Sequence, residues 1–343
     1  MSVIEVKHLT KRYGKHTAVD DLSFTVEAGE IYGFLGPNGA GKSTTMNILT
    51  GCLAATSGEA LINGFDIFEE PKEAKKCIGY LPEIPPVYGN RTVREYLRFV
   101  AEAKKVPREK VEPEIERTMA LTGTKEYENR LIRHLSKGYR QRVGIAEALI
   151  GDPEVIILDE PTVGLDPQQI VEIRELIASL KDRHTVILSS HILSEIQSVC
   201  EKVIIINHGR IVALDTPENL EKTFRQSTTV RVLLECPKDR AAEFVEAHFA
   251  DLPLKETSAE ETEDGTAVSF TLGDVGEKDL ARQLFFAAAE ERIAILQLET
   301  RRLSLEEVFL KLTGDPALSG ADPSIGEENG SDNDLLKDGG DSK

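Results

Sequence analysis

The sequence predicts an α/β protein, in which a parallel sheet is followed by a smaller α+β domain and a polar tail. A glycine-rich loop at 36–43 stands between a short apolar run and an apolar-periodic segment, in the order strand, loop, helix. Further apolar runs at 155–158, 186–189 and 203–207 alternate with helix-like segments such as 170–180. This alternation is typical of parallel strands connected by helices.

The glycine-rich loop predicts a phosphate-binding site. It fits the pattern G-x-x-x-x-G-K-[ST] with Gly36, Pro37, Asn38, Gly39, Ala40, Gly41, Lys42 and Ser43. An alternating β hairpin is expected at 3–30 and a strand at 31–35, and a helix opens at Thr44. Glycine allows backbone N–H groups to converge on phosphate oxygens at the helix N-terminus. We expect Lys42 to reach the β and γ phosphates of a nucleotide, the Ser43 hydroxyl to hold Mg²⁺, and Thr44 to join the nucleotide-binding residues. A glycine-rich turn with a chance lysine is the alternative, which the flanking strand and helix disfavour.

Two adjacent carboxylates, Asp159 and Glu160, follow the apolar run at 155–158. A buried parallel strand here would deliver Asp159 to the magnesium ion and Glu160 to the side from which water attacks the γ phosphate. The alternative is a strand that ends in two solvated acids. The phosphate-binding loop upstream favours the catalytic interpretation.

Residues 3–220 resemble the ATP-binding subunit of an ABC transporter, because three more motifs follow in that family's order: Leu135-Ser136-Lys137-Gly138-Tyr139, Gly164-Leu165-Asp166-Pro167, and His191. In that family the signature Leu-Ser-Gly-Gly-Gln of one subunit closes over the γ phosphate held by the other. The resemblance implies this role for Ser136 and Gly138 and places Asp166 at the dimer seam. Lys137 and Tyr139 depart from the consensus, which leaves the rate and tightness of closure open.

The resemblance implies three further nucleotide contacts. His191 matches the switch histidine that contacts the γ phosphate and positions water, although a lone histidine at a strand end is more often structural. Tyr13 stands where the family places an aromatic ring that stacks on adenine. Because stacking discriminates little between bases, specificity for ATP over GTP should be loose. The alternative is an exposed tyrosine in a hairpin. Glu83 replaces the usual glutamine, and its charged oxygen is expected to bind Mg²⁺.

The implied fold is a P-loop NTPase ABC ATPase domain at 1–220, with a helical subdomain at about 84–150. Thr92 and Glu95 have the form of a capping box, opening a helical insert at about 92–133. In the family this subdomain receives the coupling helix of a membrane partner, here expected at the rim around Glu83, Pro85, Pro86 and Tyr88.

A second domain is expected at 227–313, where strands and helices follow the ferredoxin-like order β-α-β-β-α-β. It resembles the C-terminal accessory domain of ATPases that drive two-component exporters, and the segment at 303–309 strengthens the match. Such a domain is expected to regulate or dimerise. The tail at 314–343 is rich in Gly, Asp, Ser and Asn and nearly empty of aromatics, so a disordered acidic tail is expected.

Composition restricts the partners and the compartment. The formal net charge of −18 over 343 residues weighs against nucleic acid, whose phosphates require clustered lysine and arginine. No apolar run approaches the roughly twenty residues of a membrane helix, and residues 1–7 lack the regions of a signal peptide. The four cysteines are scattered without metal-site spacing. We expect a cytoplasmic protein that is peripheral on the inner face of the cell membrane.

The functional hypothesis is an ATPase subunit that dimerises on ATP, as a homodimer, and powers export through a separate integral membrane permease. Lys42, Glu160 and His191 would be catalytic, and Ser43, Asp159 and Glu83 would hold Mg²⁺. The alternatives are a soluble ABC-type ATPase acting on a macromolecular complex and an importer subunit. No residue is expected to contact the transported molecule, because the passage lies in another polypeptide.

Overall fold

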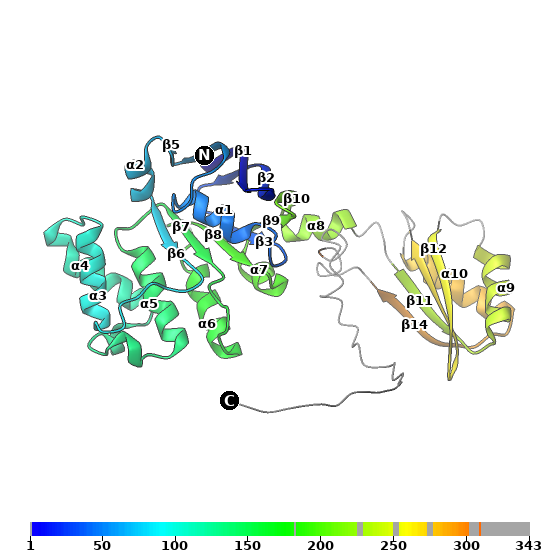
Figure 1. Ribbon diagram of the computed structural model, residues 1–343. Coiled ribbons are helices and arrows are strands. Elements are labelled where there is room, and N and C mark those ends of the chain that lie inside the picture. Colours follow the sequence, from blue (N-terminus) through cyan, green and yellow to red (C-terminus); the bar gives the residue numbers. More distant parts are fainter. Residues whose placement is uncertain are drawn as a thin grey trace, which may run out of the picture.

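The computed structural model describes residues 2–181, 183–224, 229–249, 254–272, 277–301 and 309. Their strands form three sheets (Figure 1). The first sheet has the order β2-β1-β4-β5 and is built around the expected hairpin. Its strands are β1 Ser2–Tyr13, β2 His16–Glu27, β4 Ser57–Ile62 and β5 Phe65–Asp66.

The central sheet has the order β10-β9-β3-β8-β7-β6. Its strands are β3 Ile31–Leu35, β6 Ile78–Leu81, β7 Val155–Asp159, β8 Thr185–Ser190, β9 Lys202–Asn207 and β10 Arg210–Asp215. All neighbours pair in parallel except β10, which pairs antiparallel with β9 through a short turn. Because β3, β7 and β8 are parallel, the loops that follow them leave from one edge of the sheet (Figure 1).

Both faces of the central sheet are buried, as its continuous apolar runs predict. Alternate side chains of β3, β7, β8 and β9 enter two different cores, with Tyr32 and Phe34 of β3 on one side and Ile31 and Leu35 on the other. The first core also contains residues of the first sheet and of α1 Lys42–Leu49. The second contains residues of α5 Lys137–Leu149, α6 Pro167–Ala178 and α7 Leu193–Val199. The phosphate-binding loop is therefore anchored in a strand that cannot move without disturbing both cores.

The segment between β6 and β7 is helical and has a core of its own. It contains α3 Val93–Ala103, α4 Arg108–Leu121, the short 3₁₀ turns η1 Lys125–Tyr127 and η2 Ile132–His134, and α5. The capping box expected at the start of α3 is present, since the Thr92 hydroxyl accepts from the Glu95 N–H while the Glu95 carboxylate accepts from the Thr92 N–H. The sequence patterns did not predict β4, β5, α2 Pro71–Lys76, α7 or α8 Pro217–Phe224.

The remaining elements follow in the order β11 Thr229–Leu234, α9 Lys238–Phe249, β12 Leu254–Thr262, β13 Gly265–Leu272, α10 Glu277–Glu290 and β14 Ile295–Arg301. Their antiparallel sheet has the order β12-β13-β11-β14 and contributes to a separate core (Figure 1). Phe309 is buried with Leu220 in the second core of the central sheet. The predicted tail at 314–343 and residues 303–308 lie outside the described residues. Within the described part of the chain, no helix combines the length and apolar character needed to cross a membrane.

Arg94 holds the helical segment together electrostatically. Its guanidinium, at the start of α3, donates to Glu112 and Glu116 of α4 and to Glu128 beyond η1. Lys125 bridges Glu116 and Glu128, and hydrogen bonds from Lys125 and Arg94 lower the pKa of the Glu116 carboxyl. Planar guanidinium groups suit such multiple carboxylate contacts.

We predict that Arg94→Ala lowers the midpoint of thermal unfolding by about 2–4 °C at neutral pH and low salt. Because the carboxyl pKa is lowered in the folded state, this contribution is present above the unfolded pKa and lost as pH falls through the folded value. Calorimetry of Arg98→Ala provides the control, since Arg98 pairs only with Glu112 among these carboxylates and is more exposed. Equal effects of the two substitutions at neutral pH would contradict the network.

Candidate functional site

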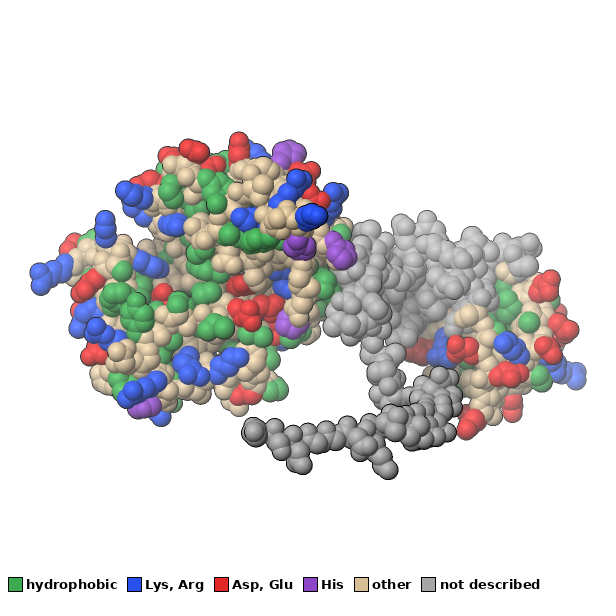
Figure 2. Space-filling view, in the orientation of Figure 1, with side chains coloured by type: hydrophobic (Ala, Val, Ile, Leu, Met, Phe, Trp, Pro, Cys, Tyr) green, Lys and Arg blue, Asp and Glu red, His purple; other side chains and the backbone are tan. Residues whose placement is uncertain are grey.

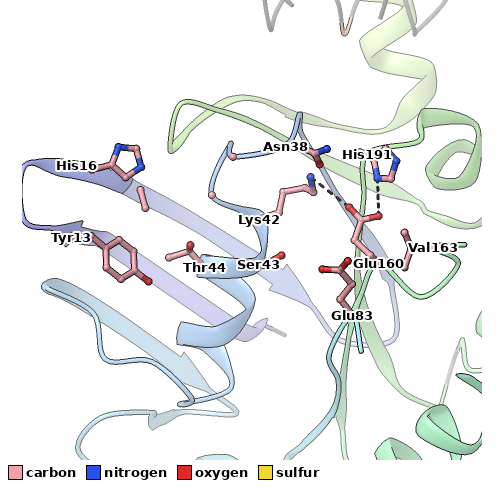
Figure 3. A pocket seen from close by; sticks show the side chains of 13 residues that line it. Tyr13, His16, Asn38, Lys42, Ser43, Thr44, Glu83, Glu160, Val163 and His191 are labelled. Carbon is pink, nitrogen blue, oxygen red and sulfur yellow. Dashed lines mark hydrogen bonds and ion pairs between the residues drawn. The ribbon is translucent and has the colours of Figure 1, made fainter. Parts of the chain in front are cut away.

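A cavity of about 400 Å³ opens at the edge of the central sheet from which the loops after β3, β7 and β8 leave (Figure 3). Five separate regions of sequence meet in it: the β1–β2 hairpin, the phosphate-binding loop with α1, the loop after β6, the residues after β7, and the residue after β8. Its lining residues are Tyr13, His16, Ala18, Asn38, Gly39, Gly41, Lys42, Ser43, Thr44, Glu83, Glu160, Val163 and His191.

The phosphate-binding loop needs its glycines for two different reasons. Gly39 and Gly41 have φ angles of 79° and 107°, a region that favours glycine. Gly36 and Gly41 also lie against backbone, because an added Cβ would stand 2.5 Å from the Ile206 carbonyl oxygen and 2.5 Å from the Ala18 carbonyl oxygen, respectively. Any side chain at these positions would push the loop away from β2 and β9.

Lys42 is the first residue of α1 and is 6% exposed. Its ammonium donates to the carbonyl oxygens of Gly36, at 2.8 Å, and Pro37, at 3.3 Å, and lies 3.5 Å from the Glu160 carboxylate. A buried cation at a helix N-terminus, ringed by loop backbone, is suited to an anionic ligand.

Glu160 lies between two basic groups, with one carboxylate oxygen facing Lys42 and the other 2.9 Å from Nδ1 of His191 (Figure 3). The carboxylate side chain is 9% exposed, whereas His191 is 36% exposed and faces the cavity. A buried carboxylate requires such partners, since an unpaired charge is costly to bury. The arrangement places a potential base and the group that orients it beside a cation suited to phosphate.

Asp159 and Glu160 are held in place by Ser189, which sequence analysis treated only as part of a strand. The Ser189 hydroxyl donates to Asp159 Oδ1 at 2.5 Å and accepts from the Glu160 N–H at 2.9 Å. Glu160 has a φ of 48°, which is unusual for a residue with a side chain and needs support from its surroundings. Ser189 provides that support from the neighbouring strand.

Of the three expected Mg²⁺ ligands, Ser43 and Glu83 line the cavity and Asp159 does not. The Ser43 hydroxyl donates to Asp159 Oδ1 at 3.3 Å, and Glu83 lines the same cavity (Figure 3). The described residues contain no group of three His, Cys, Asp or Glu side chains arranged around a metal position. Magnesium fits nevertheless, since it commonly binds through one or two protein oxygens together with substrate phosphates and water.

The end of the β1–β2 hairpin supplies two rings. Tyr13 and His16 are paired across the turn and both line the cavity (Figure 3). Tyr13 is 49% exposed, and the Lys11 ammonium lies 5.2 Å from its ring centroid. Sequence analysis assigned no role to His16, Ala18 or Val163. The hairpin pattern could have suggested His16, because a two-residue turn places it opposite Tyr13.

Ser136, Gly138 and Asp166 do not line this cavity but lie together elsewhere. Ser136 and Asp166 cap α5 and α6 by accepting from the N–H groups of Tyr139 and Gln169, respectively. A Cβ on Gly138 would stand 2.5 Å from Gln169 Oε1, so the two helix starts are tightly packed. The cavity and the capped helix starts are thus two separate features of one chain.

Fold and cavity together define a phosphate-loop ATPase. The ABC transporter family pattern matches residues 19–163. The bacitracin transport ATP-binding protein BcrA of Bacillus licheniformis is 36% identical over 91% of this chain and 98% of its own length. The linearmycin resistance ATP-binding protein LnrL of Bacillus subtilis is 29% identical with the same coverage.

Solved structures agree with this assignment. The ATP-binding subunit of an ABC transporter is 31% identical, with a TM-score of 0.59, over 65% of this chain and 93% of its own. A dimeric ATP-binding cassette bound to ADP and phosphate, at 24% identity and a TM-score of 0.57, covers 62% of this chain and 98% of its own and shows the fold alone. The chain belongs to the family of ABC transporter ATP-binding proteins and is an ATP hydrolase of that type. The resemblance inferred from the sequence is thereby confirmed.

We predict that Ser189→Ala destabilises the fold by about 1–3 kcal/mol, because it leaves the buried Glu160 N–H and one Asp159 contact without a partner. It should also lower the ATP hydrolysis rate by releasing the backbone of Glu160. Urea unfolding and steady-state ATPase assays measure the two effects. Ser179→Ala removes only a hydroxyl that donates to a carbonyl at the end of α6 and serves as control. An unchanged rate in Ser189→Ala would refute the support assigned to Ser189.

Proposed function

We propose that this chain is the ATP-hydrolysing subunit of an ABC exporter, dimerises on ATP, and works through a separate integral membrane permease. The observation that carries this proposal is the division of the site within one chain. Lys42, Glu160 and His191 meet in the cavity, whereas the helix starts capped by Ser136 and Asp166 lie outside it. Two copies arranged head to tail would bring the cavity of one copy opposite the capped helix starts of the other.

The cavity residues suggest a mechanism for hydrolysis. The backbone of residues 36–41 and the Lys42 ammonium would bind the β and γ phosphates, with Tyr13 against the base. Glu160 would accept a proton from the attacking water, and His191, hydrogen-bonded to Glu160, would keep both correctly oriented. Ser43, Asp159 and Glu83 would hold Mg²⁺, which supplies positive charge against the phosphates when bound.

The partner subunit would complete the site. Ser136 and Gly138 stand at the start of α5, where free N–H groups and the helix dipole favour an anion. Facing the partner's nucleotide, this helix start would stabilise the γ phosphate, and Asp166 would line the seam beside it. The Lys137 side chain packs over Gly164 of its own chain, within reach of that seam.

The surface beside Glu83 suits a permease. Ile84, Tyr88 and Phe99 are 81%, 49% and 44% exposed, and the Tyr88 ring lies 5.4 Å from that of Phe99. Exposed apolar side chains gathered beside a catalytic loop are typical of a protein contact. Such docking would place the chain on the inner face of the membrane. Among the described residues on the face seen in Figure 2, blue and red side chains are interspersed, which does not favour nucleic acid.

We further propose that residues 1–220 form the ATPase domain, with its helical subdomain at about 84–150, and residues 227–313 a ferredoxin-like accessory domain. Within that second range, Phe309 packs with Leu220 in the second core and so belongs structurally to the first domain. The strand order β12-β13-β11-β14 and the separate core support the second unit. The names of two relatives refer to bacitracin transport and linearmycin resistance, which favours export.

We predict that Glu160→Gln binds ATP, hydrolyses it at least about 100-fold more slowly, and accumulates as an ATP-bound dimer. The amide keeps the shape of the side chain but cannot accept the proton. Light scattering after gel filtration with ATP and Mg²⁺ measures the mass. Combining Glu160→Gln with Ser136→Arg should return a monomer, because the arginine would obstruct the partner's γ phosphate. Rapid ATP hydrolysis and the absence of a dimer in Glu160→Gln would contradict the assignment of Glu160 as the catalytic base.

The permease is tested by purifying tagged protein from detergent-solubilised membranes of its own host and identifying what accompanies it by mass spectrometry. We expect a stoichiometric polytopic membrane protein, which Ile84→Asp should release while ATP binding persists. Phe285→Asp is the control, because Phe285 is 60% exposed in the second unit. Recovery of ribosomal or DNA-associated proteins alone would instead favour a soluble ABC-type ATPase.

A further inference from the structure

Glu195 is a buried carboxylate next to the cavity to which neither the sequence nor the proposed mechanism assigns a role. It lies in the first turn of α7 and is 3% exposed. One of its oxygens, Oε2, accepts two hydrogen bonds, from the Thr162 hydroxyl at 2.6 Å and from the Ser190 hydroxyl at 2.9 Å. A carboxylate is costly to bury unless hydrogen bonds satisfy it, and these two hydrogen bonds do so for Oε2.

The two hydroxyl donors stand next to the residues proposed to react: Thr162 lies in the loop after β7, and Ser190 is the last residue of β8. Thr162 comes two residues after Glu160, and Ser190 directly precedes His191. Ser190 also accepts from the Ile192 N–H at 2.9 Å, which shapes the backbone on both sides of His191. A single oxygen of Glu195 therefore ties the loop after β7 to the last residue of β8.

The second oxygen of Glu195 faces α6. Glu195 Oε1 lies 4.0 Å from Nη2 of Arg174, and neither Glu195 Oε1 nor Arg174 Nε has a hydrogen-bond partner among the described residues. Arg174 therefore offsets the charge of Glu195 without fixing its position closely. The hydrogen bonds of Glu195 with Thr162 and Ser190 are short, and they determine how the loop after β7 lies relative to the end of β8.

We propose that Glu195 is a positioning residue that fixes the distance between Glu160 and His191. On the sheet side, the Ser189 hydroxyl accepts from the Glu160 N–H. On the other side, Glu195 accepts from the Thr162 hydroxyl and so restrains the chain that follows Glu160. The unusual φ of Glu160 is thus restrained on both sides, and His191 is restrained through Ser190. The 2.9 Å contact between His191 and Glu160 follows from these two restraints. The proposal rests on the proposed roles of Glu160 and His191.

The test compares variants of Glu195 and Thr162 in the full-length protein. Glu195→Ala should lower kcat about 10- to 100-fold, because a displacement of about 1 Å is enough for such a loss, while KM for ATP stays within about twofold. Glu195→Gln should remain within about threefold of the parent protein, since its carbonyl oxygen can accept both hydroxyls. Thr162→Val should also lower kcat. The double variant Thr162→Val/Glu195→Ala should have nearly the same kcat as Glu195→Ala alone, because both substitutions remove the same hydrogen bond.

A matched carboxylate separates positioning from simple loss of stability. Glu147 in α5 is half-buried and accepts from the Tyr96 hydroxyl at 2.6 Å, far along the chain from His191. Glu147→Ala should lower the unfolding midpoint but leave kcat unchanged. If Glu195→Ala lowers only the midpoint, as Glu147→Ala does, Glu195 has no positioning role. Should Glu195→Ala fail to fold, Thr162→Val gives the decisive comparison.

A spectroscopic readout is independent of turnover. In long-range ¹H–¹⁵N spectra of histidine-labelled protein, His191 should show one fixed tautomer set by Glu160, and Glu195→Ala or Thr162→Val should lose it. Unaltered His191 resonances in both variants would overturn the proposal. The His191→Ala variant separates this proposal from the proposed function. A normal ATP hydrolysis rate in His191→Ala would reject the proposed role of His191. A low rate in His191→Ala together with a normal rate in Glu195→Ala would reject only the positioning role of Glu195.

Discussion

The parallel pairing of β3, β7 and β8 is the constraint on which the rest of the structure depends. It aligns Leu35 with Ser190 and Asp159 with Ser189, so that the phosphate-binding loop, the two carboxylates and His191 leave the sheet at one edge. The strands are buried on both faces, and a shift of one residue would exchange the two cores. The packing of apolar side chains thus determines where these polar groups lie, although they are far apart in the sequence.

Within this frame, the site is a chain of charged and hydroxyl groups in which each member restrains the next. Lys42 and His191 contact the Glu160 carboxylate, Ser189 supports the backbone of Glu160, and Glu195 links the loop after β7 to the end of β8. Lys42 is also the group proposed to bind phosphate. Phosphate and Glu160 therefore compete for one ammonium, which couples nucleotide binding to the position of the proposed base.

Several elements were inaccessible to reasoning from the sequence, each for a physical reason. Strand β4 begins Ser57-Gly58-Glu59, whose polarity hides the strand, and α2 has six residues, too few for a helical period to show. Strand β10 pairs antiparallel because its connection to β9 is a turn and not a helix, so the central sheet is mixed. His16 was overlooked as a lining residue because a lone histidine carries no signal by itself, although the two-residue turn that places it opposite Tyr13 could have indicated it.

The sequence by itself determined the family, the phosphate-binding loop, the order of the motifs and most strands of the central sheet. These depend on local patterns: glycines where backbone must approach backbone, apolar runs of strand length, and caps three residues from their donors. Only the tertiary structure decided which side chains meet. Contacts such as Thr162 with Glu195 and Ser189 with Asp159 join residues about thirty positions apart, and their distances follow from strand register and helix packing, which local patterns do not encode.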